Sequence, residues 1–234
     1  MYFGMLDPTF IILIPAMIFA FFAQSKVQSA YKRYAGVRNR NGITGAQAAR
    51  KILDSNGLEQ VPIEITQGKL SDHYDPRKKV MRLSQNVYND PSIASVSIAA
   101  HESGHAIQDE KGYAALKIRN TMAPAVSVAS NLSWPLLIIG IVITSAGYYS
   151  GGNMLFNIGI FLFVGVVIFH AVTLPVEFNA SKLAVAELLR LEIIHEEERT
   201  SAKKVLSAAA MTYIAALAVA VANLLRILAI RGRN

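Results

Sequence analysis

The sequence predicts a mainly α-helical membrane protein with three or four transmembrane helices and a small cytoplasmic element of α+β structure. Three observations lead to this fold class. Of the 234 residues, 53% are hydrophobic and only 17% are charged, which is too apolar for a soluble domain of this size. Several uncharged stretches approach or exceed the 20 or so residues that a membrane helix needs. The basic residues are concentrated between the first and second of these stretches.

The first expected transmembrane helix lies within residues 1–25, because no charged side chain occurs from Pro8 to Ser25. A cleaved signal peptide is the alternative interpretation. No basic residue precedes the apolar run, however, and no small-residue cleavage site follows it, so we favour a membrane anchor. Basic residues begin directly after it, at Lys26. The positive-inside rule then predicts an N-terminus outside the cell and a following segment in the cytoplasm.

Residues 26–120 are expected to form the cytoplasmic domain. They hold 15 of the 23 Lys and Arg residues. A capping-box pattern predicts a short helix over about 45–55, and alternation of apolar and polar residues predicts short strands at 61–66 and 79–83. The intervening segment SDHYDPRKK has the composition of a turn.

A longer helix is expected over about 91–111. Asp90 is its predicted N-cap, Pro91 occupies the first helical position, and Gly112 ends the helix.

Two further transmembrane helices are expected in residues 121–176, because the chain has no charged residue between Arg119 and Glu177. The turn-rich segment GYYSGGN divides this stretch into a helical hairpin. Residues 177–204 are then expected to return to the cytoplasm as a helix. Residues 205–234 are expected to contain a fourth helix, whose Ala-rich composition is also compatible with packing inside a protein bundle.

The predicted helix 91–111 carries the segment HESGH, from His101 to His105. Residues four positions apart share a helix face, so both imidazoles can bind one metal ion, and Glu102 can reach a water molecule bound there. Zinc lowers the pKa of its bound water and polarises a carbonyl, while a carboxylate takes the proton. We therefore predict one Zn²⁺ ion held by His101 and His105, with Glu102 as catalytic base. Two ordinary helical histidines are the alternative, but burying them without a partner is costly.

A catalytic zinc ion commonly has three protein ligands. The chain has no cysteine, so the third ligand must be a His or a carboxylate. Glu177 is our first candidate, because a carboxylate at the membrane edge requires a partner. Ser181 shares its helical face and could hydrogen-bond a metal ligand. His170, inside the third expected span, and His73 are the alternatives.

The segments SDHYDPRKKVMRLS, AAHESGHAIQ and LPVEFNASKLA, framed by membrane helices, resemble the YugP-type family of bacterial membrane zinc metallopeptidases. A more distant resemblance is to HtpX and the CAAX-prenyl proteases, in which a glutamate in an E-F-x-A-D pattern follows HExxH. The resemblance implies a zincin-like element and a peptidase activity, with His101, His105 and Glu177 as ligands and Glu102 as base. Ser181 stands where the HtpX-like pattern has Asp. The resemblance therefore does not imply a charged side chain that hydrogen-bonds a metal ligand at this position.

These features together predict a zinc metalloendopeptidase of the plasma membrane. Its active site would face the cytoplasm, and its substrates would be membrane or membrane-adjacent polypeptides. A catalytically inactive zinc-binding membrane scaffold is the alternative, and a transporter with an incidental motif is a third hypothesis.

The lipid bilayer is a predicted partner and nucleic acid is not, because basic residues beside membrane spans have a simpler cause in topology. The sequence does not indicate the substrate-binding residues or the oligomeric state. Five side chains are chemically capable of stabilising an oxyanion: His73, Tyr74, Arg190, His195 and Tyr213.

Overall fold

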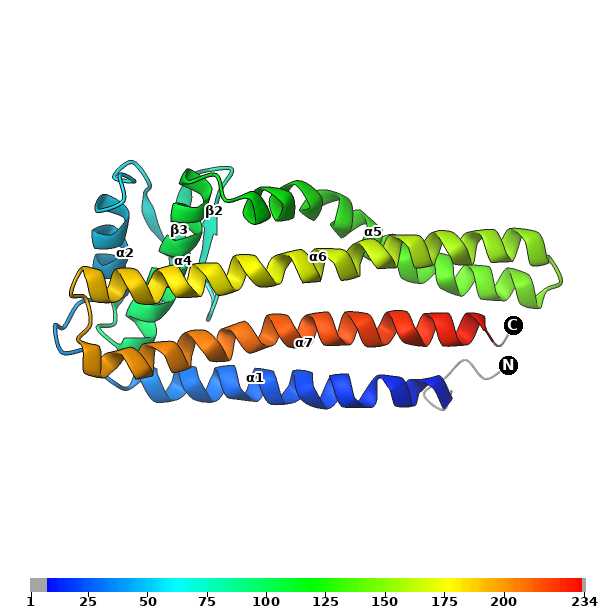
Figure 1. Ribbon diagram of the computed structural model, residues 1–234, viewed down its shortest axis with the longest axis horizontal. Coiled ribbons are helices and arrows are strands. Elements are labelled where there is room, and N and C mark those ends of the chain that lie inside the picture. Colours follow the sequence, from blue (N-terminus) through cyan, green and yellow to red (C-terminus); the bar gives the residue numbers. More distant parts are fainter. Residues whose placement is uncertain (1–7, 233–234) are drawn as a thin grey trace. The chain divides into compact units, whose positions relative to one another are not determined.

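A computed structural model describes residues 8–232 of the chain (Figure 1). The chain divides into two compact units. The apolar unit comprises residues 8–22, 117–174 and 213–232, and the mixed unit comprises residues 23–116 and 175–212. The elements, in chain order, are η1 (Pro8–Ile12), α1 (Ile14–Ala35), α2 (Gly45–Asp54), β1 (Ile63–Thr66), β2 (His73–Asp75), β3 (Val80–Ser84), α3 (Gln85–Asn89), α4 (Ile93–Glu110), α5 (Ala114–Ser145), α6 (Tyr149–Arg190), η2 (Glu196–Glu198) and α7 (Arg199–Arg231).

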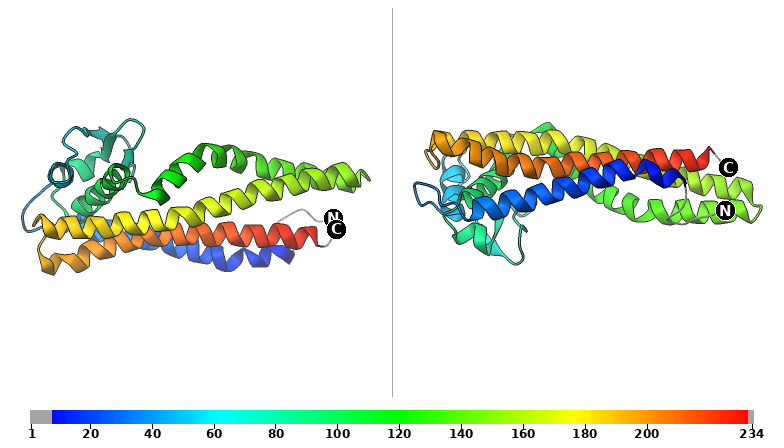
Figure 2. Two further views of the ribbon diagram at one scale, coloured as in Figure 1. Left: turned by 45° about the horizontal axis from the view of Figure 1, so that its top comes forward. Right: turned by 90° about the horizontal axis from the view of Figure 1, so that it is seen from below.

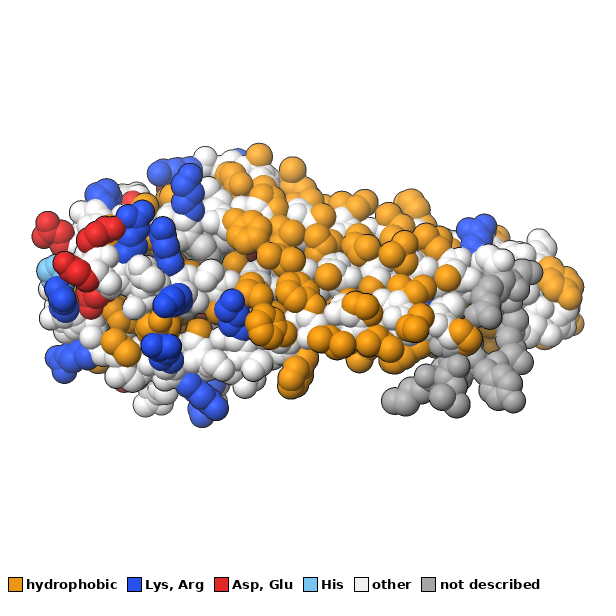
Figure 3. All heavy atoms as spheres, turned by 60° about the horizontal axis from the view of Figure 1, so that its bottom comes forward, with side chains coloured by type: hydrophobic (Ala, Val, Ile, Leu, Met, Phe, Trp, Pro, Cys, Tyr) orange, Lys and Arg blue, Asp and Glu red, His pale blue; other side chains and the backbone are white. Residues whose placement is uncertain are grey.

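Three helical segments in the described part of the chain are long and apolar enough to cross a membrane: α5, α6 and the segment Glu196–Arg231, which contains α7. Only 17–22% of the most apolar window of each is buried within the protein. Most of these apolar side chains therefore face outward, and Figure 3 shows hydrophobic side chains covering the visible face of the apolar unit. This is the surface expected of helices solvated by lipid.

The first predicted transmembrane helix is not among these three segments within residues 8–232. The apolar run is divided between η1 and the first part of α1, and α1 reaches Lys26 within its first four turns. Its apolar side chains are nevertheless strongly exposed, as in Ile18 and Phe21, which are 65% and 79% accessible. The fourth predicted helix, in contrast, satisfies the length and composition of a membrane span.

The two predicted helices between Arg119 and Glu177 are present as α5 and α6, joined by a tight turn at Gly147 in place of the longer predicted loop. Small residues let their backbones approach closely: a Cβ added at Gly140 would lie 2.8 Å from the Gly152 carbonyl oxygen. Helix α6 then continues without interruption through Pro175 to Arg190. The predicted cytoplasmic helix 177–204 is therefore not a separate element. The first half of the predicted helix is the end of α6. A turn and η2 then separate α6 from α7 (Figure 2).

The mixed unit contains a three-stranded sheet in the order β1-β3-β2. β1 lies within the first predicted strand, and β3 overlaps the second but ends one residue later, at Ser84. The two strands pair in parallel, with Ile63 opposite Met81. The segment predicted as a turn contributes a third strand: β2 pairs antiparallel with β3, and Tyr74 lies opposite the same Met81. β2 is only three residues long and only Tyr74 is buried, so its sequence shows no strand periodicity.

Helix α4 packs in the core of the mixed unit, against a buried cluster that includes Ile52, Leu83 and Leu188. It begins two residues later than predicted, because Ser92 and not Asp90 is the N-cap: the Ser92 side chain accepts a hydrogen bond from the backbone of Ser95. Asp90 instead ends α3, a short helix that the sequence did not reveal. The predicted capping box at the start of α2, between Thr44 and Gln47, is present.

Candidate metal centre

Close contact between α4 and α6 within the mixed unit builds the candidate site. Gly104 lies between the two histidines of HESGH, and a Cβ placed there would be 2.7 Å from the carbonyl oxygen of Ala180. Any larger side chain would therefore separate the two helices. Since Ala180 lies three residues after Glu177, this contact brings the carboxylate of α6 to the imidazoles of α4.

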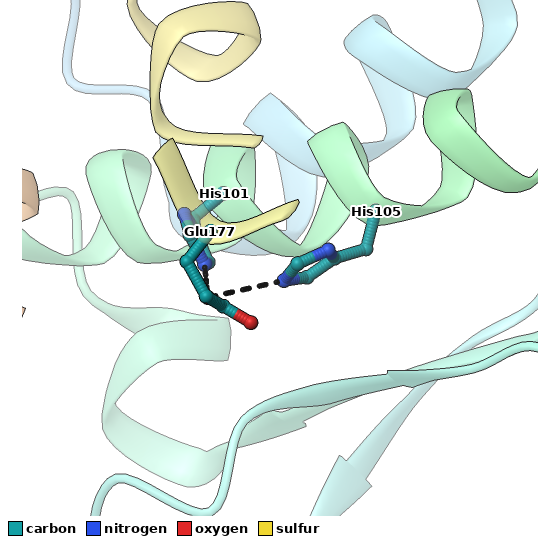
Figure 4. A group of neighbouring side chains, drawn as sticks. All are labelled: His101, His105 and Glu177. Carbon is teal, nitrogen blue, oxygen red and sulfur yellow. Dashed lines mark hydrogen bonds and ion pairs between the residues drawn. The ribbon is translucent and has the colours of Figure 1, made fainter. Parts of the chain in front are cut away.

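His101, His105 and Glu177 offer ligand atoms that all lie within 4.8 Å of one another (Figure 4). Oε2 of Glu177 is 3.2 Å from Nε2 of His101 and 3.6 Å from Nε2 of His105. Two ligand atoms of a tetrahedral zinc site, each about 2.0–2.1 Å from the ion, lie about 3.3 Å apart. The three side chains are 4–13% exposed. The two distances to Glu177 and the chemistry of the group, two imidazoles and one carboxylate, therefore fit a zinc ion.

The other ring nitrogen of each histidine has a partner. Nδ1 of His101 is 3.2 Å from Oγ of Ser181, so Ser181 lies where the helical spacing predicted. Nδ1 of His105 is 3.0 Å from Oε1 of Gln108. In both histidines the Nε2 atom faces Glu177, and the Nδ1 atom faces a neighbouring polar side chain. This is the common arrangement around metal-binding histidines.

Glu102, the predicted base, is buried beside this group. One carboxylate oxygen accepts a hydrogen bond from the backbone N–H of Tyr74 in β2, at 3.1 Å. Burial raises the pKa of the Glu102 carboxyl to about 7, while the adjacent His101 acts in the opposite direction. The Tyr74 hydroxyl donates to Asp109 near the end of α4, at 3.0 Å. β2 is thus attached to α4 at two points, and one of them orients Glu102.

The two alternative third ligands do not join the ligand group in the described part of the chain. His73 is exposed in β2, and its Nδ1 is 2.8 Å from the backbone carbonyl of Ser71. His170 lies two helical turns before Glu177 on α6, about 10 Å along the axis.

Two of the side chains that could stabilise an oxyanion, Arg190 and His195, have polar partners outside the ligand group. The Arg190 guanidinium donates to Glu187 at 3.2 Å, and Nε2 of His195 is 3.1 Å from the Asn41 side chain. The structure therefore brings the predicted metal ligands together and places Arg190 and His195 in polar contacts outside the ligand group.

Two contacts of the site, one from the Gln108 side chain and one from the Tyr74 backbone, were not predicted from the sequence. Gln108 lies three residues after His105, a spacing that shares a helix face and could have indicated it. The backbone N–H of Tyr74 could not have been found in this way, because a main-chain donor carries no sequence signal and β2 was not predicted.

Comparison with known proteins supports a zinc enzyme. The model of a family described as "putative neutral zinc metallopeptidase" matches residues 9–232. The chain belongs to this metallopeptidase family. It is also 45% identical over 223 residues, covering 94% of this chain and 96% of the relative, to a Bacillus subtilis (strain 168) protein named "Putative membrane protease YugP". No solved structure matches the chain. The family description names zinc. The ligand atoms of His101, His105 and Glu177 form a group that could hold such an ion.

Proposed function

We propose that this chain is a zinc-dependent endopeptidase that hydrolyses peptide bonds of membrane or membrane-adjacent polypeptides. One observation carries the proposal: two imidazole nitrogens and a carboxylate oxygen converge within 4.8 Å, and a buried glutamate adjoins them in the sequence. Membership of a zinc metallopeptidase family supports the same reaction class. The relative's name, which includes "membrane protease", supports polypeptide substrates at a membrane.

The residues divide into two roles. His101, His105 and Glu177 would hold the zinc ion. Zinc, when bound, lowers the pKa of water and polarises a carbonyl group. Glu102 takes a proton from the attacking water and returns it to the leaving amine, as a general base and then a general acid. The Tyr74 backbone N–H fixes one Glu102 oxygen, which restricts the orientation of this carboxylate.

The position of Glu177 in the sequence supports a substrate at the membrane. It is the first charged residue after the uncharged stretch that begins beyond Arg119, and it belongs to the same continuous helix α6. A ligand at the end of an apolar segment is suited to cleavage beside the bilayer. The excess of basic residues in 26–120 supports a cytoplasmic location of the active site, with the N-terminus outside.

The decisive variant is Glu102→Gln in the full-length protein, purified in detergent. We expect it to retain one zinc ion per chain, because Glu102 is not a ligand, and to lose about 10²–10⁴-fold in cleavage of a casein-type or membrane-protein substrate. Glu110→Gln is the matched control, since it makes the same change at an exposed position of α4. Wild-type cleavage by Glu102→Gln with full zinc would refute the base assignment. Stoichiometric zinc in a wild-type protein without turnover would instead identify the zinc-binding scaffold.

A further inference from the structure

The Gln108 side chain links the two halves of the candidate metal centre, the histidines of α4 and the Glu177 segment of α6. It lies on α4, one turn after His105, and is only 2% exposed. Its amide nitrogen donates to the backbone carbonyl of Val176, at 2.9 Å, and to Oδ1 of Asn179, at 2.8 Å. Both acceptors lie on α6, on either side of Glu177 in the sequence. The same amide therefore contacts a histidine from one helix and the segment that carries the carboxylate from the other.

These contacts determine which end of the Gln108 amide faces His105. The Val176 carbonyl can only accept hydrogen bonds, so the amide nitrogen must face it. The amide oxygen then faces Nδ1 of His105 at 3.0 Å, and this oxygen can only accept. His105 must consequently carry its ring proton on Nδ1. Its Nε2 lone pair is thereby left facing Glu177, which is the tautomer that metal binding through Nε2 requires.

We infer that Gln108 is a positioning residue of the metal centre: its amide oxygen selects the metal-binding tautomer and orientation of His105, while its amide nitrogen holds the Glu177 segment of α6 against α4. The inference rests on the proposed metal site and not on the proteolytic activity. Partners of this kind around metal-binding histidines commonly change metal affinity about 10–100-fold when they are removed. The two functions of the amide can be separated by substitution, because different atoms perform them.

Two substitutions of similar size separate them. Gln108→Met removes both the acceptor and the donors. Gln108→Glu keeps an oxygen toward His105, as a stronger acceptor, but removes the donors to Val176 and Asn179. Both variants should lower the thermal midpoint of the metal-free protein, because each leaves buried acceptors on α6 without their donor. Gln108→Met should lower zinc affinity by about 10–100-fold, and Gln108→Glu should lower it by clearly less, because it keeps the acceptor that orients His105.

The measurement is the zinc dissociation constant of each full-length variant in detergent, determined by competition with a chromophoric chelator. The thermal midpoint is recorded after exhaustive chelation. Asn179→Ala is the control, because it removes one acceptor from Gln108 and leaves the Val176 and His105 contacts in place. We expect its zinc affinity to stay within about threefold of wild type, well below the loss that follows removal of a direct partner of a ligand.

Equal losses of zinc affinity in Gln108→Met and Gln108→Glu would overturn the inference, because they would show that Gln108 acts only as a structural tie between the helices. Wild-type affinity in Gln108→Met would also overturn it, while leaving the metal site intact. A wild-type protein that binds no zinc would overturn both the inference and the proposed function. If Gln108→Glu does not fold, the comparison of Gln108→Met with Asn179→Ala still tests the acceptor, since only the former loses the contact with His105.

Discussion

Replacing Gly104 by alanine tests whether the close contact between α4 and α6 builds the metal centre. An added Cβ would lie 2.7 Å from the Ala180 carbonyl oxygen and 3.2 Å from its Cα. These are backbone atoms of a helix, so no side-chain rotation can relieve the contact. Restoring an ordinary separation of about 3.5 Å requires the helices to move apart by about 0.8 Å, the difference between 3.5 and 2.7.

The consequence for zinc binding follows from this displacement. Glu177 lies one turn before Ala180, so it would withdraw from His101 by a similar amount, from 3.2 Å to about 4 Å. That spacing is farther from the roughly 3.3 Å that separates two ligand atoms of a tetrahedral zinc ion. Helix propensity favours alanine by about 1 kcal/mol, whereas overpacking costs about 1–3 kcal/mol. We therefore expect a net destabilisation of at most about 2 kcal/mol, but a loss of zinc affinity of about 10–100-fold.

The assay is a zinc titration of detergent-purified Gly104→Ala, with the thermal midpoint measured in parallel. Gly165→Ala is the matched control. It makes the same change within α6, where an added Cβ has no neighbour within 4 Å, and it should retain zinc affinity. Wild-type zinc affinity in Gly104→Ala would show that α4 and α6 tolerate the methyl group. The contact at Ala180 would then not determine the position of Glu177.

Three further predictions concern the metal and its surroundings. Chelation should abolish cleavage and lower the thermal midpoint, and zinc at about 100 times its dissociation constant should restore about 2.7 kcal/mol of stability; a chelator-resistant protease would contradict the proposal. Glu177→Ala should purify without stoichiometric zinc, whereas His170→Ala should retain it, as measured by atomic absorption. The opposite pattern would show that His170, and not Glu177, is the third ligand. Tyr74→Phe should lower the free energy of unfolding by about 0.5–1.5 kcal/mol, because it removes the hydrogen bond to Asp109. It should preserve activity, because the Tyr74 backbone N–H that donates to Glu102 is unchanged; a large fall in activity would assign a role to the hydroxyl.

The helices of this chain were largely predictable from local sequence. Uncharged stretches predicted α5, α6 and α7, because the length of an apolar segment is itself the requirement for crossing a membrane. The capping box at Thr44 predicted the start of α2. The predictions failed where two local signals competed. Asp90-Pro91 has the form of a helix start, but Asp90 ends α3 and Ser92 caps α4.

Strand β2 was not predictable from its sequence. Three residues cannot show an alternating pattern, and the surrounding charged and turn-forming residues favour a loop. It forms because β3 offers a pairing edge and because Tyr74 bonds to two residues of α4. Both are contacts between segments distant in the chain, and neither leaves a local signal.

The sequence by itself determined the pair of histidines on one helix face and the glutamate beside them, because a spacing of four residues has the same meaning in any α-helix. It also determined that α5, α6 and α7 are apolar enough for a membrane. Only the tertiary structure decided that Glu177, rather than His170 or His73, lies 3.2 Å from His101. It also decided that the buried amide of Gln108 contacts His105. The reason is physical: ligand geometry depends on how closely α4 and α6 approach at Gly104 and Ala180, and that distance is set by packing between segments far apart in the chain.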